Sequence, residues 1–395
     1  MNILRGRSKE RDVGQGGAAG AGMMPEVDAT PGVTCPDVSV LIPVRNGGVY
    51  LAPALDSILA QTGVSFEVIC VDDGSSDGTG EMLAAYARRH PGVLRAVRAT
   101  GRGISSALNQ AIDLARGHFL ARMDADDLTQ PDRLALQTRH LAAHPELGAL
   151  GSQALLIDEA GRLRGRLRVP VGTKRVHAAL RTSSALIHPT VMMRRDAVLA
   201  AGGYRSLFDG AEDYDLWLRL AARTCLDNLA LPLLQYRRYD RPQTRQRDFQ
   251  RAQLAALAVV TAGLRATHGR DPIAGLRDMA GWRAALAVMD PAAVDRVRHL
   301  TASRLADNGG TLSAAGTLYL RRACRSAAHG PRDVRNRLAL ACVRHELQLM
   351  RNGRWAEALS VLARDIVQGR GSLVRAYIWH ASILWRSKSF RFYLR

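Results

Sequence analysis

The sequence predicts an α/β fold, with a mostly parallel sheet covered by helices on both faces, followed by an all-helical C-terminal region. Short apolar runs alternate with segments of helical periodicity through the first third of the chain. Several of these runs are uninterrupted, which is typical of parallel strands buried on both faces. After about residue 245 the strand signals end, and Ala, Leu and Arg alternate instead. We therefore expect a disordered tail over 1–35, an α/β domain over 36–245 and a helical region over 246–395.

The expected elements follow the chain in order. Apolar runs predict strands at 38–42, 66–71, 93–97 and 118–123. Apolar residues at helical spacing predict the helices between them, at 51–61, from Thr79 and at 104–112. Thr79 is expected as the N-cap of the second helix, because its hydroxyl can accept a backbone hydrogen bond. Beyond these, the pattern predicts a helix from Pro131, a strand at 148–157, a basic hairpin at 162–168, and an extended segment from Ile187 that leads into a short helix.

Polar loops follow three of the four expected strands. They are Pro43–Asn46, Asp72–Asp77 and Asp124–Asp127. In open parallel sheets, ligands bind beyond the carboxyl ends of the strands. Because all three loops would meet at that edge, together they predict a binding site more strongly than any one of them does alone.

The third loop holds three carboxylates within four residues, directly after a strand that is expected to be buried. Mg²⁺ is usually held by one or two carboxylates together with substrate phosphates. Asp124 and Asp126 therefore predict a site for a hard divalent cation, Mg²⁺ or Mn²⁺, and for the diphosphate of a nucleotide compound. The alternative is a solvated acidic turn, which is the better interpretation of such a pair in isolation.

A second group of acids opens the helix that is expected after Gly210. Helical spacing places Asp213 on the apolar face of that helix. It places Glu212 on the other face, where Asp215 and Arg219 can pair. Acids in a first turn complement the helix dipole, which accounts for Glu212 and Asp215. An acid on the inward face needs a partner or a chemical role, so Asp213 is the candidate for function.

The 395 residues carry a formal net charge of +19, and nearly all of the positive charge is Arg. About 25 basic and about 10 acidic side chains lie after residue 245. Such a balance fits nucleic acid, an anionic membrane, an anionic substrate, or plain compositional bias. The charge is spread and no base-reading module is recognisable, so we expect no nucleic-acid partner.

The five cysteines show neither metal-site spacing nor a disulfide pattern, which favours a reducing compartment. No run of eighteen apolar residues predicts a transmembrane helix, and the N-terminus lacks the apolar core of a secretory signal. Residues 373–394 mix aromatic and basic side chains, as interfacial membrane helices and ordinary terminal helices both do. We expect a cytoplasmic protein, and peripheral contact with the inner face of an anionic cell membrane is an alternative that the pattern leaves open.

Five segments of the α/β domain form a recognisable series. They are Val38–Asn46, Val71–Thr79, Met123–Asp127, Ile187–Val191 and Gly210–Arg219. In these segments, their order and their spacing, the first part of the chain to about residue 240 resembles a family 2 glycosyltransferase with the GT-A (Rossmann-like) fold. The resemblance implies metal-dependent transfer of a sugar from a nucleotide-diphosphate sugar to an acceptor hydroxyl, with inversion at the anomeric carbon. It implies surface polysaccharide or glycolipid synthesis on a carbohydrate or lipid-linked acceptor.

The resemblance also implies which residues bind the donor. Pro43 and its neighbours Arg45 and Asn46 would line the base pocket, where Arg45 replaces the aromatic residue that is common in the family. Its guanidinium can stack on the base instead. Asp73 would accept the N3–H of a pyrimidine, which makes a UDP-sugar the default donor. Arg102 is the nearest match to a basic residue that touches the donor in the family.

Further roles follow from the same resemblance. Asp124 would contact the ribose or the metal, Asp126 would ligate the metal, and Asp213 would be the catalytic base. His188 would lie on the acceptor side of the cleft, although a lone His before Pro is more often a hydrogen-bonded structural residue. Arg237 and its neighbour could reach the diphosphate or form a solvated basic turn.

Other function classes remain open at this point. The chain could be a catalytically silent nucleotide-sugar-binding scaffold whose helical region is the working part. The complete set of acids argues against this, because a silent copy would be free to lose one. A nucleotidyltransferase could share the sheet and the acidic loop, but it would release pyrophosphate from a nucleoside triphosphate, and a product assay separates the two reactions.

Overall fold

The computed structural model describes residues 35–239, 245–269, 271, 273–274 and 289–307. The strands within them are β1 (Val38–Val44), β2 (Phe66–Asp72), β3 (Leu94–Arg98), β4 (Phe119–Arg122), β5 (Leu128–Thr129), β6 (Leu147–Ile157), β7 (Leu163–Leu167), β8 (Met192–Arg194) and β9 (Cys225–Arg237). They form one nine-stranded sheet in the order β3-β2-β1-β4-β8-β6-β9-β5, and β7 pairs with β6 outside that path.

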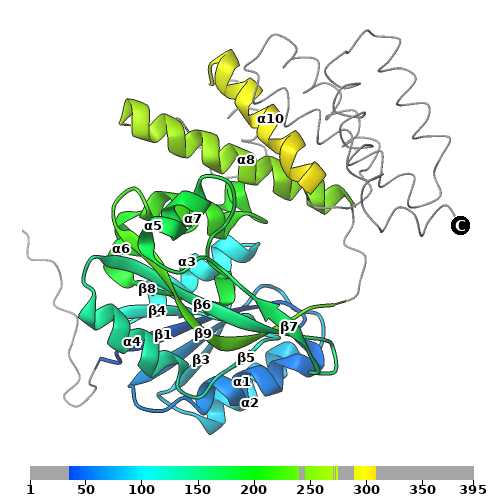
Figure 1. Cartoon of the computed structure of the whole chain (residues 1–395). Coiled ribbons are helices and arrows are strands. Elements are labelled where there is room, and N and C mark those ends of the chain that lie inside the picture. Colours follow the sequence, from blue (N-terminus) through cyan, green and yellow to red (C-terminus); the bar gives the residue numbers. More distant parts are fainter. Residues whose placement is uncertain (1–34, 240–244, 270, 272, 275–288, 308–395) are drawn as a thin grey trace, which may run out of the picture. The chain divides into compact units, whose positions relative to one another are not determined.

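Helices cover both faces of this sheet, as the sequence predicts. The α-helices are α1 (Leu51–Leu59), α2 (Thr79–Arg89), α3 (Ile104–Leu114), α4 (Arg133–Ala143), α5 (Thr173–Leu180), α6 (Arg195–Ala200), α7 (Glu212–Leu220), α8 (Arg245–His268) and α10 (Pro291–Asp307). Short 3₁₀ turns are η1 (Gly48–Tyr50), η2 (His188–Thr190) and η3 (Ser206–Phe208). In Figure 1, α1 and α2 lie on one face of the sheet, and α3, α5 and α7 lie on the other.

Strands β3, β2, β1 and β4 form a parallel half-sheet, as predicted, and each lies within one or two residues of its expected run. The sequence places the end of the first strand at Pro43, but β1 continues through it. Pro43 pairs with β2 opposite Val71, whereas the register with β4 ends at Leu41. On the β4 side, the missing proline N–H therefore removes no ladder bond.

The central strands alternate between two hydrophobic cores. Leu41, Ile69 and Leu120 belong to the core on the side of α3 and α7. Val40 and Val68 belong to the core on the side of α1 and α2. All five side chains are fully buried, so both faces of these strands need apolar residues. This is why the runs are continuous in the sequence rather than alternating.

The other half of the sheet is mixed. β8 is antiparallel to β4 and to β6, β5 is antiparallel to β9, and β6 runs parallel to β9. The predicted basic hairpin forms, with β7 antiparallel to β6. The sequence pattern does not predict β9, because Asp227, Asn228 and Pro232 interrupt its apolar residues. Its register with β6 shifts near Pro232, so pairing with a distant strand, rather than local propensity, determines this element.

Thr79 has a different role from the one expected. It is the first residue of α2, and the N-cap is Gly78. The Thr79 hydroxyl accepts a hydrogen bond from the Gly47 N–H at 2.9 Å, and the Thr79 N–H donates to Asp77 Oδ1 at 3.1 Å. The hydroxyl therefore joins the loop after β1 to the loop after β2, and the Asp77 carboxylate satisfies an N–H of the first turn.

Two helices of the predicted C-terminal region, α8 and α10, lie among the described residues. Leu254 and Leu257 of α8 share a core with Trp217 of α7. No helix in the described ranges is long and apolar enough to cross a membrane. The expected tail, except for its last residue, and the aromatic, basic stretch at 373–394 lie outside the described residues, and the expected domain boundaries stay predictions.

Candidate active site

The loops that follow β1 and β2 are tied together at the edge of the sheet. The Asp73 N–H donates to the Val44 carbonyl at 2.8 Å. The Asn46 N–H donates to Ser75 Oγ at 2.9 Å, and Asn46 Oδ1 accepts from the Ser76 N–H at 2.9 Å. Asn46 has a positive φ of 52°, a conformation that Asn tolerates better than most residues. The Asn46 side chain therefore holds the two loops together. Any contact between Asn46 and a nucleotide base would be made while the side chain keeps this hydrogen bond.

Asp73 faces the loop that leads into α3. The Gly103 N–H lies 3.1 and 3.2 Å from the two carboxylate oxygens of Asp73. Gly103 has a φ of +92°, and a Cβ atom there would lie 2.2 Å from Asp209 Oδ2, so only glycine fits between the two acids. A carboxylate accepts several hydrogen bonds, so Asp73 keeps capacity for the N3–H of a pyrimidine. Arg102 is exposed next to this contact.

Three carboxylates gather immediately beyond β4. Asp124, Asp126 and Asp127 each offer an oxygen, and these oxygens lie within 4.8 Å of one another. Burial and the charge of Asp124 raise the pKa values of Asp126 and Asp127. Asp127 Oδ2 is buried and has no hydrogen-bond partner among the described residues. A divalent cation would relieve both the repulsion and the missing contact, so the cluster fits the metal that the sequence predicts.

Arg122, the last residue of β4, lies directly behind this cluster. Its Nη2 atom is 2.5 Å from Asp124 Oδ1, and its side chain is only 3% exposed. Nε and Nη1 are buried without a hydrogen-bond partner in the described part of the chain. Burial disfavours the charged guanidinium, but the Asp124 carboxylate outweighs this and raises the pKa of Arg122. Sequence inspection missed this residue because it looks like one polar position in an apolar strand.

The end of β9 closes the other side of the acidic cluster. The Tyr239 hydroxyl donates to Asp126 Oδ2 at 2.7 Å, and the Arg237 N–H donates to Asp127 Oδ1 at 2.8 Å. The Arg237 guanidinium lies over the Tyr50 ring, 4.6 Å from its centroid. Arg237 is buried in strand β9, so it does not form the solvated basic turn that was one of its two interpretations. It bonds the Asp126 carbonyl and holds the acidic loop in place.

The second acid group lies on α7, and its exposure differs from the prediction. Glu212, Asp215 and Arg219 are buried, whereas Asp213 is half-buried. The assignment of Asp213 to the inward face and of Glu212 to the outer face is therefore wrong. The predicted pair does form, with Arg219 Nη2 2.8 Å from Asp215 Oδ2. Charges can lie inside a protein where they are paired, which a count of apolar positions does not detect.

Asp213 has few partners of its own. Asp213 Oδ1 accepts from the Tyr214 N–H at 2.7 Å, and Oδ2 is 3.5 Å from Ser184 Oγ. Removal from water raises the pKa of Asp213, and hydrogen bonding and the charge of Arg122 reduce that rise. A partly exposed carboxylate with a raised pKa suits a general base, because it can reach a substrate and takes up a proton readily.

Glu212, the neighbour of Asp213 in the chain, lies close to His188. The His188 Nδ1 atom is 3.9 Å from Glu212 Oε1, and its Nε2 atom is 2.9 Å from the Tyr204 hydroxyl. Burial and the charge of Arg122 lower the pKa of His188 well below its usual range, so the ring is neutral. Burial and the charge of Asp213 raise the pKa of Glu212 to about 7. His188 is thus a hydrogen-bonded core residue, and it is absent from the described carboxylate cluster that could hold a metal.

The remaining predicted donor residues are spread over the rim of the sheet. Pro43 is half-buried at the end of β1, and Arg45 and Asn46 are exposed in the loop that follows. Asp73 and Asp124 lie at the ends of β2 and β4, the two neighbours of β1 in the sheet. The predicted convergence of three polar loops at one edge is therefore what the strand order produces. The individual roles of these residues stay predictions.

A family model described as Glycosyl transferase family 2 matches residues 39–201. The O-antigen biosynthesis glycosyltransferase WbnJ of Escherichia coli is 33% identical over 204 residues, which cover 51% of this chain and 79% of WbnJ. EpsE of Bacillus subtilis (strain 168) is 34% identical over 187 residues, which cover 47% of this chain and 66%, just under two thirds, of EpsE.

Solved structures agree on the fold. The crystal structure of S. aureus TarS 1-349 in complex with UDP-GlcNAc has a TM-score of 0.52 with this chain. The likeness covers 84% of this chain and 92% of that chain at 17% sequence identity. It confirms the predicted fold class, an α/β sheet covered by helices. With the match to the family model and to most of WbnJ, the chain belongs to glycosyltransferase family 2.

Proposed function

We propose that this chain is an inverting, metal-dependent enzyme that moves a sugar from a nucleotide-diphosphate sugar, by default a UDP-sugar, to an acceptor hydroxyl. The observation that carries the proposal is the position of Arg122 between two acid groups. It pairs directly with Asp124, and its charge also acts on Asp213 across the site. Because the same guanidinium acts on both groups, we assign the cluster at the end of β4 and the acid on α7 to one active site, as its donor site and its base.

The donor would lie against the loops after β1 and β2. Asp73 accepts a backbone N–H there and keeps lone pairs for a pyrimidine N3–H. Pro43, Arg45, Asn46 and Arg102 are the residues of the surrounding rim. Binding of UDP-GlcNAc by TarS, which shares the fold, supports a uridine nucleotide as the first donor to test.

Asp126 and Asp124 would hold a divalent cation, Mg²⁺ or Mn²⁺. Such a cation, when bound, neutralises charge on a departing nucleotide diphosphate. The chain prepares this site by keeping three carboxylates close together and largely out of water. Arg122 balances part of their charge through Asp124, the Arg237 N–H orients Asp127, and the Tyr239 hydroxyl donates to Asp126 Oδ2 while no metal is bound.

Asp213 would act as the general base. It takes the proton of the acceptor hydroxyl while the acceptor oxygen forms a bond to the anomeric carbon of the donor. The bond between that carbon and the phosphate oxygen breaks, and the nucleotide diphosphate leaves with the electron pair. Attack from the face opposite the leaving group gives inversion in one step, without a covalent intermediate.

The acceptor class follows from the relatives. WbnJ is named for O-antigen biosynthesis, which supports an acceptor hydroxyl on a surface polysaccharide or on a glycolipid. A lipid-linked acceptor would bring the enzyme to the inner face of the cell membrane. Anionic lipid attracts basic segments, which agrees with the net charge of +19.

The first experiment is a binding and product assay on the whole chain. Thermal shifts are measured with the diphosphates of uridine, thymidine and guanosine, with and without Mn²⁺, because a ligand of the native state raises its stability. We expect metal-dependent stabilisation by the uridine nucleotide and release of UDP, without pyrophosphate, when a UDP-sugar and an acceptor are added. No stabilisation by any nucleotide would contradict the proposal, whereas stabilisation without release of UDP would favour a silent nucleotide-sugar-binding scaffold. Pyrophosphate release would favour a nucleotidyltransferase.

A further inference from the structure

The helix that carries Asp213 is anchored by a series of charged side chains on its buried side. Asp215, two residues after Asp213, is fully buried. Arg219 lies one turn further along α7 and places Nη2 2.8 Å from Asp215 Oδ2. Arg205, from the segment between α6 and η3, donates to the same oxygen through Nε at 2.9 Å. A single carboxylate on α7 thus holds two guanidiniums.

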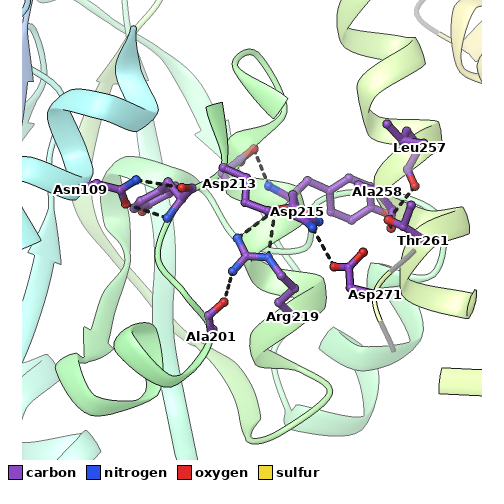
Figure 2. Close-up of polar contacts among 12 residues, drawn as sticks. Asn109, Ala201, Asp213, Asp215, Arg219, Leu257, Ala258, Thr261 and Asp271 are labelled. Carbon is purple, nitrogen blue, oxygen red and sulfur yellow. Dashed lines mark hydrogen bonds and ion pairs between the residues drawn. The ribbon is translucent and has the colours of Figure 1, made fainter. Parts of the chain in front are cut away.

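The series continues into the part of the chain that follows the sheet. Arg205 Nη1 donates to Asp271 Oδ2 at 2.7 Å. Arg265, near the end of α8, donates to the same Asp271 oxygen at 2.8 Å. Figure 2 shows the contacts that connect Arg219 and Asp215 of α7 with Asp271. The family model ends at residue 201, before all five of these residues. Asp215 and Arg219 lie in a segment that resembles the family, but the resemblance assigns them no role, and Arg265 and Asp271 lie beyond it.

Charge balance in this series depends on Asp271. The series contains three guanidiniums and two carboxylates, and each of the five side chains is at most 16% exposed. Burial raises the pKa of Asp271, but the charges of Arg205 and Arg265 outweigh it and hold the pKa below its usual range. Loss of this carboxylate would leave three guanidiniums with a single carboxylate, and Arg205 would lose one of its two ionic partners.

Arg205 also affects the acids at the start of α7 by a second route. Its neighbour Tyr204 is fixed by Asn109, which bonds both the N–H and the carbonyl of Tyr204 at 2.8 Å. The Tyr204 hydroxyl bonds His188, which lies beside Glu212. A shift of the Arg205 segment would therefore reach Glu212 and the adjacent Asp213 through side-chain contacts as well as through the helix.

We propose that Asp271 is a positioning residue of the transferase. Through Arg205 and Asp215 it fixes the orientation of α7 and directs Asp213 at the acceptor hydroxyl. This rests on the proposed function, because it takes Asp213 as the base. Asp271, which follows α8, then contributes to the geometry of the active site, although it lies about 70 residues beyond the end of the family model.

The test compares Asp271→Asn with Asp295→Asn in the full chain. Asp295 is a matched control, because it also pairs with an arginine, Arg298, but on an exposed surface of α10. For Asp271→Asn we expect kcat to fall by about 10- to 100-fold, the size of effect that misplacement of a catalytic group produces. We expect the Kd of UDP with Mn²⁺ to stay within about twofold, because the donor site is built on other elements. Asp271→Glu should recover part of kcat, and Asp295→Asn should match the native enzyme.

A second measurement reports the position of α7 without any need for activity. Hydrogen exchange of peptides that cover 212–220 should be faster in Asp271→Asn than in the native protein, whereas peptides from β1 and β2 should be unchanged. If Asp271→Asn does not fold, Arg265→Met serves instead, since it removes one partner of Asp271 and leaves Arg205. It should show the same selective loss of kcat at a smaller size.

The outcomes separate this proposal from the proposed function. Native kcat in the foldable variant, or unchanged exchange over α7, overturns the positioning role. A variant that loses donor affinity and kcat together also overturns it, because the effect is then general. If the native chain transfers no sugar at all, the proposed function fails, and the exchange experiment alone decides whether Asp271 fixes α7.

Discussion

The two acid groups of the site are held in different ways. Asp124, Asp126 and Asp127 follow one another at the end of a buried strand, so the local order of the chain brings them together. On α7, the second group is held by side chains that are distant in sequence. Arg205 pairs with Asp215, and Arg205 in turn pairs with Asp271, which follows α8. A cluster built from neighbours in sequence can be recognised before the structure is known, whereas one held by distant charges cannot. We expect the first group to control donor binding and the second to control the chemical step.

The largest effect expected is that of Asp213→Asn on transfer. Loss of a general base should lower kcat by about 10²- to 10⁴-fold. The measurement is the rate of UDP release in the presence of acceptor. Asp113→Asn, an exposed change of the same kind on α3, is the control. A fall in kcat of less than about tenfold would assign the base to another residue.

Asp126→Ala should act on binding instead. Without this ligand we expect Mn²⁺-dependent affinity for the donor to fall by about 10- to 100-fold, the usual scale for damage to a metal site. Titration of UDP with and without Mn²⁺ measures it. Asp132→Ala is the control. Asp132 is exposed and immediately precedes α4, and its side chain makes no capping hydrogen bond. A variant with native metal dependence would remove Asp126 from the metal site.

Glu212→Gln tests the electrostatics of the α7 group through stability. Burial and the charge of Asp213 raise the pKa of Glu212 from its usual 4.5 to about 7, so the folded state binds this proton more tightly than the unfolded chain. Ionisation of Glu212 therefore reduces stability as pH rises from about 4.5 to about 7, and the loss is complete above that. Glutamine removes the charge, so it should raise the free energy of unfolding by about 1 to 2 kcal/mol at pH 8 and by much less at pH 5.

Denaturant unfolding at the two pH values measures this difference. An equal change at pH 5 and pH 8 would show that packing, and not the charge of Glu212, limits stability.

The smallest effect expected concerns Tyr239. Its hydroxyl occupies Asp126 Oδ2, an oxygen that a metal would also use. Tyr239→Phe removes this competitor, so Mn²⁺ should bind about two- to fivefold more tightly in the absence of donor, the net value of one hydrogen bond. Weaker binding of Mn²⁺ would mean that the hydroxyl orients the carboxylate for the metal rather than competing with it.

Local patterns explain what the sequence could predict. The parallel half of the sheet and the meeting of three polar loops follow from continuous apolar runs and from the rule that ligands bind at strand ends. The pairing of Asp215 with Arg219 follows from helical spacing alone. Each of these depends on residues that are close in sequence.

Long-range contacts explain the features that the sequence could not predict. Arg122 is a lone charge in an apolar run, and its pairing with the cluster is visible only in three dimensions. Glu212 and Asp215 look like solvent-facing acids in the sequence, but both are buried, with His188 beside Glu212 and Arg205 paired with Asp215. Strand β9 forms because β6 and β5 pair with it, against an interrupted local pattern. Partners far along the chain override propensity and periodicity at all three places.

One experiment tests most directly whether the β4 acids control donor binding and the α7 acids control the chemical step. It is calorimetric titration of UDP and Mn²⁺ into the Asp213→Asn variant. We expect binding within about twofold of the native protein, together with the loss of transfer, because the base contributes only to the chemical step. Loss of UDP binding in this variant would contradict it. Asp213 would then belong to the donor or metal site, and the two acid groups would act as one.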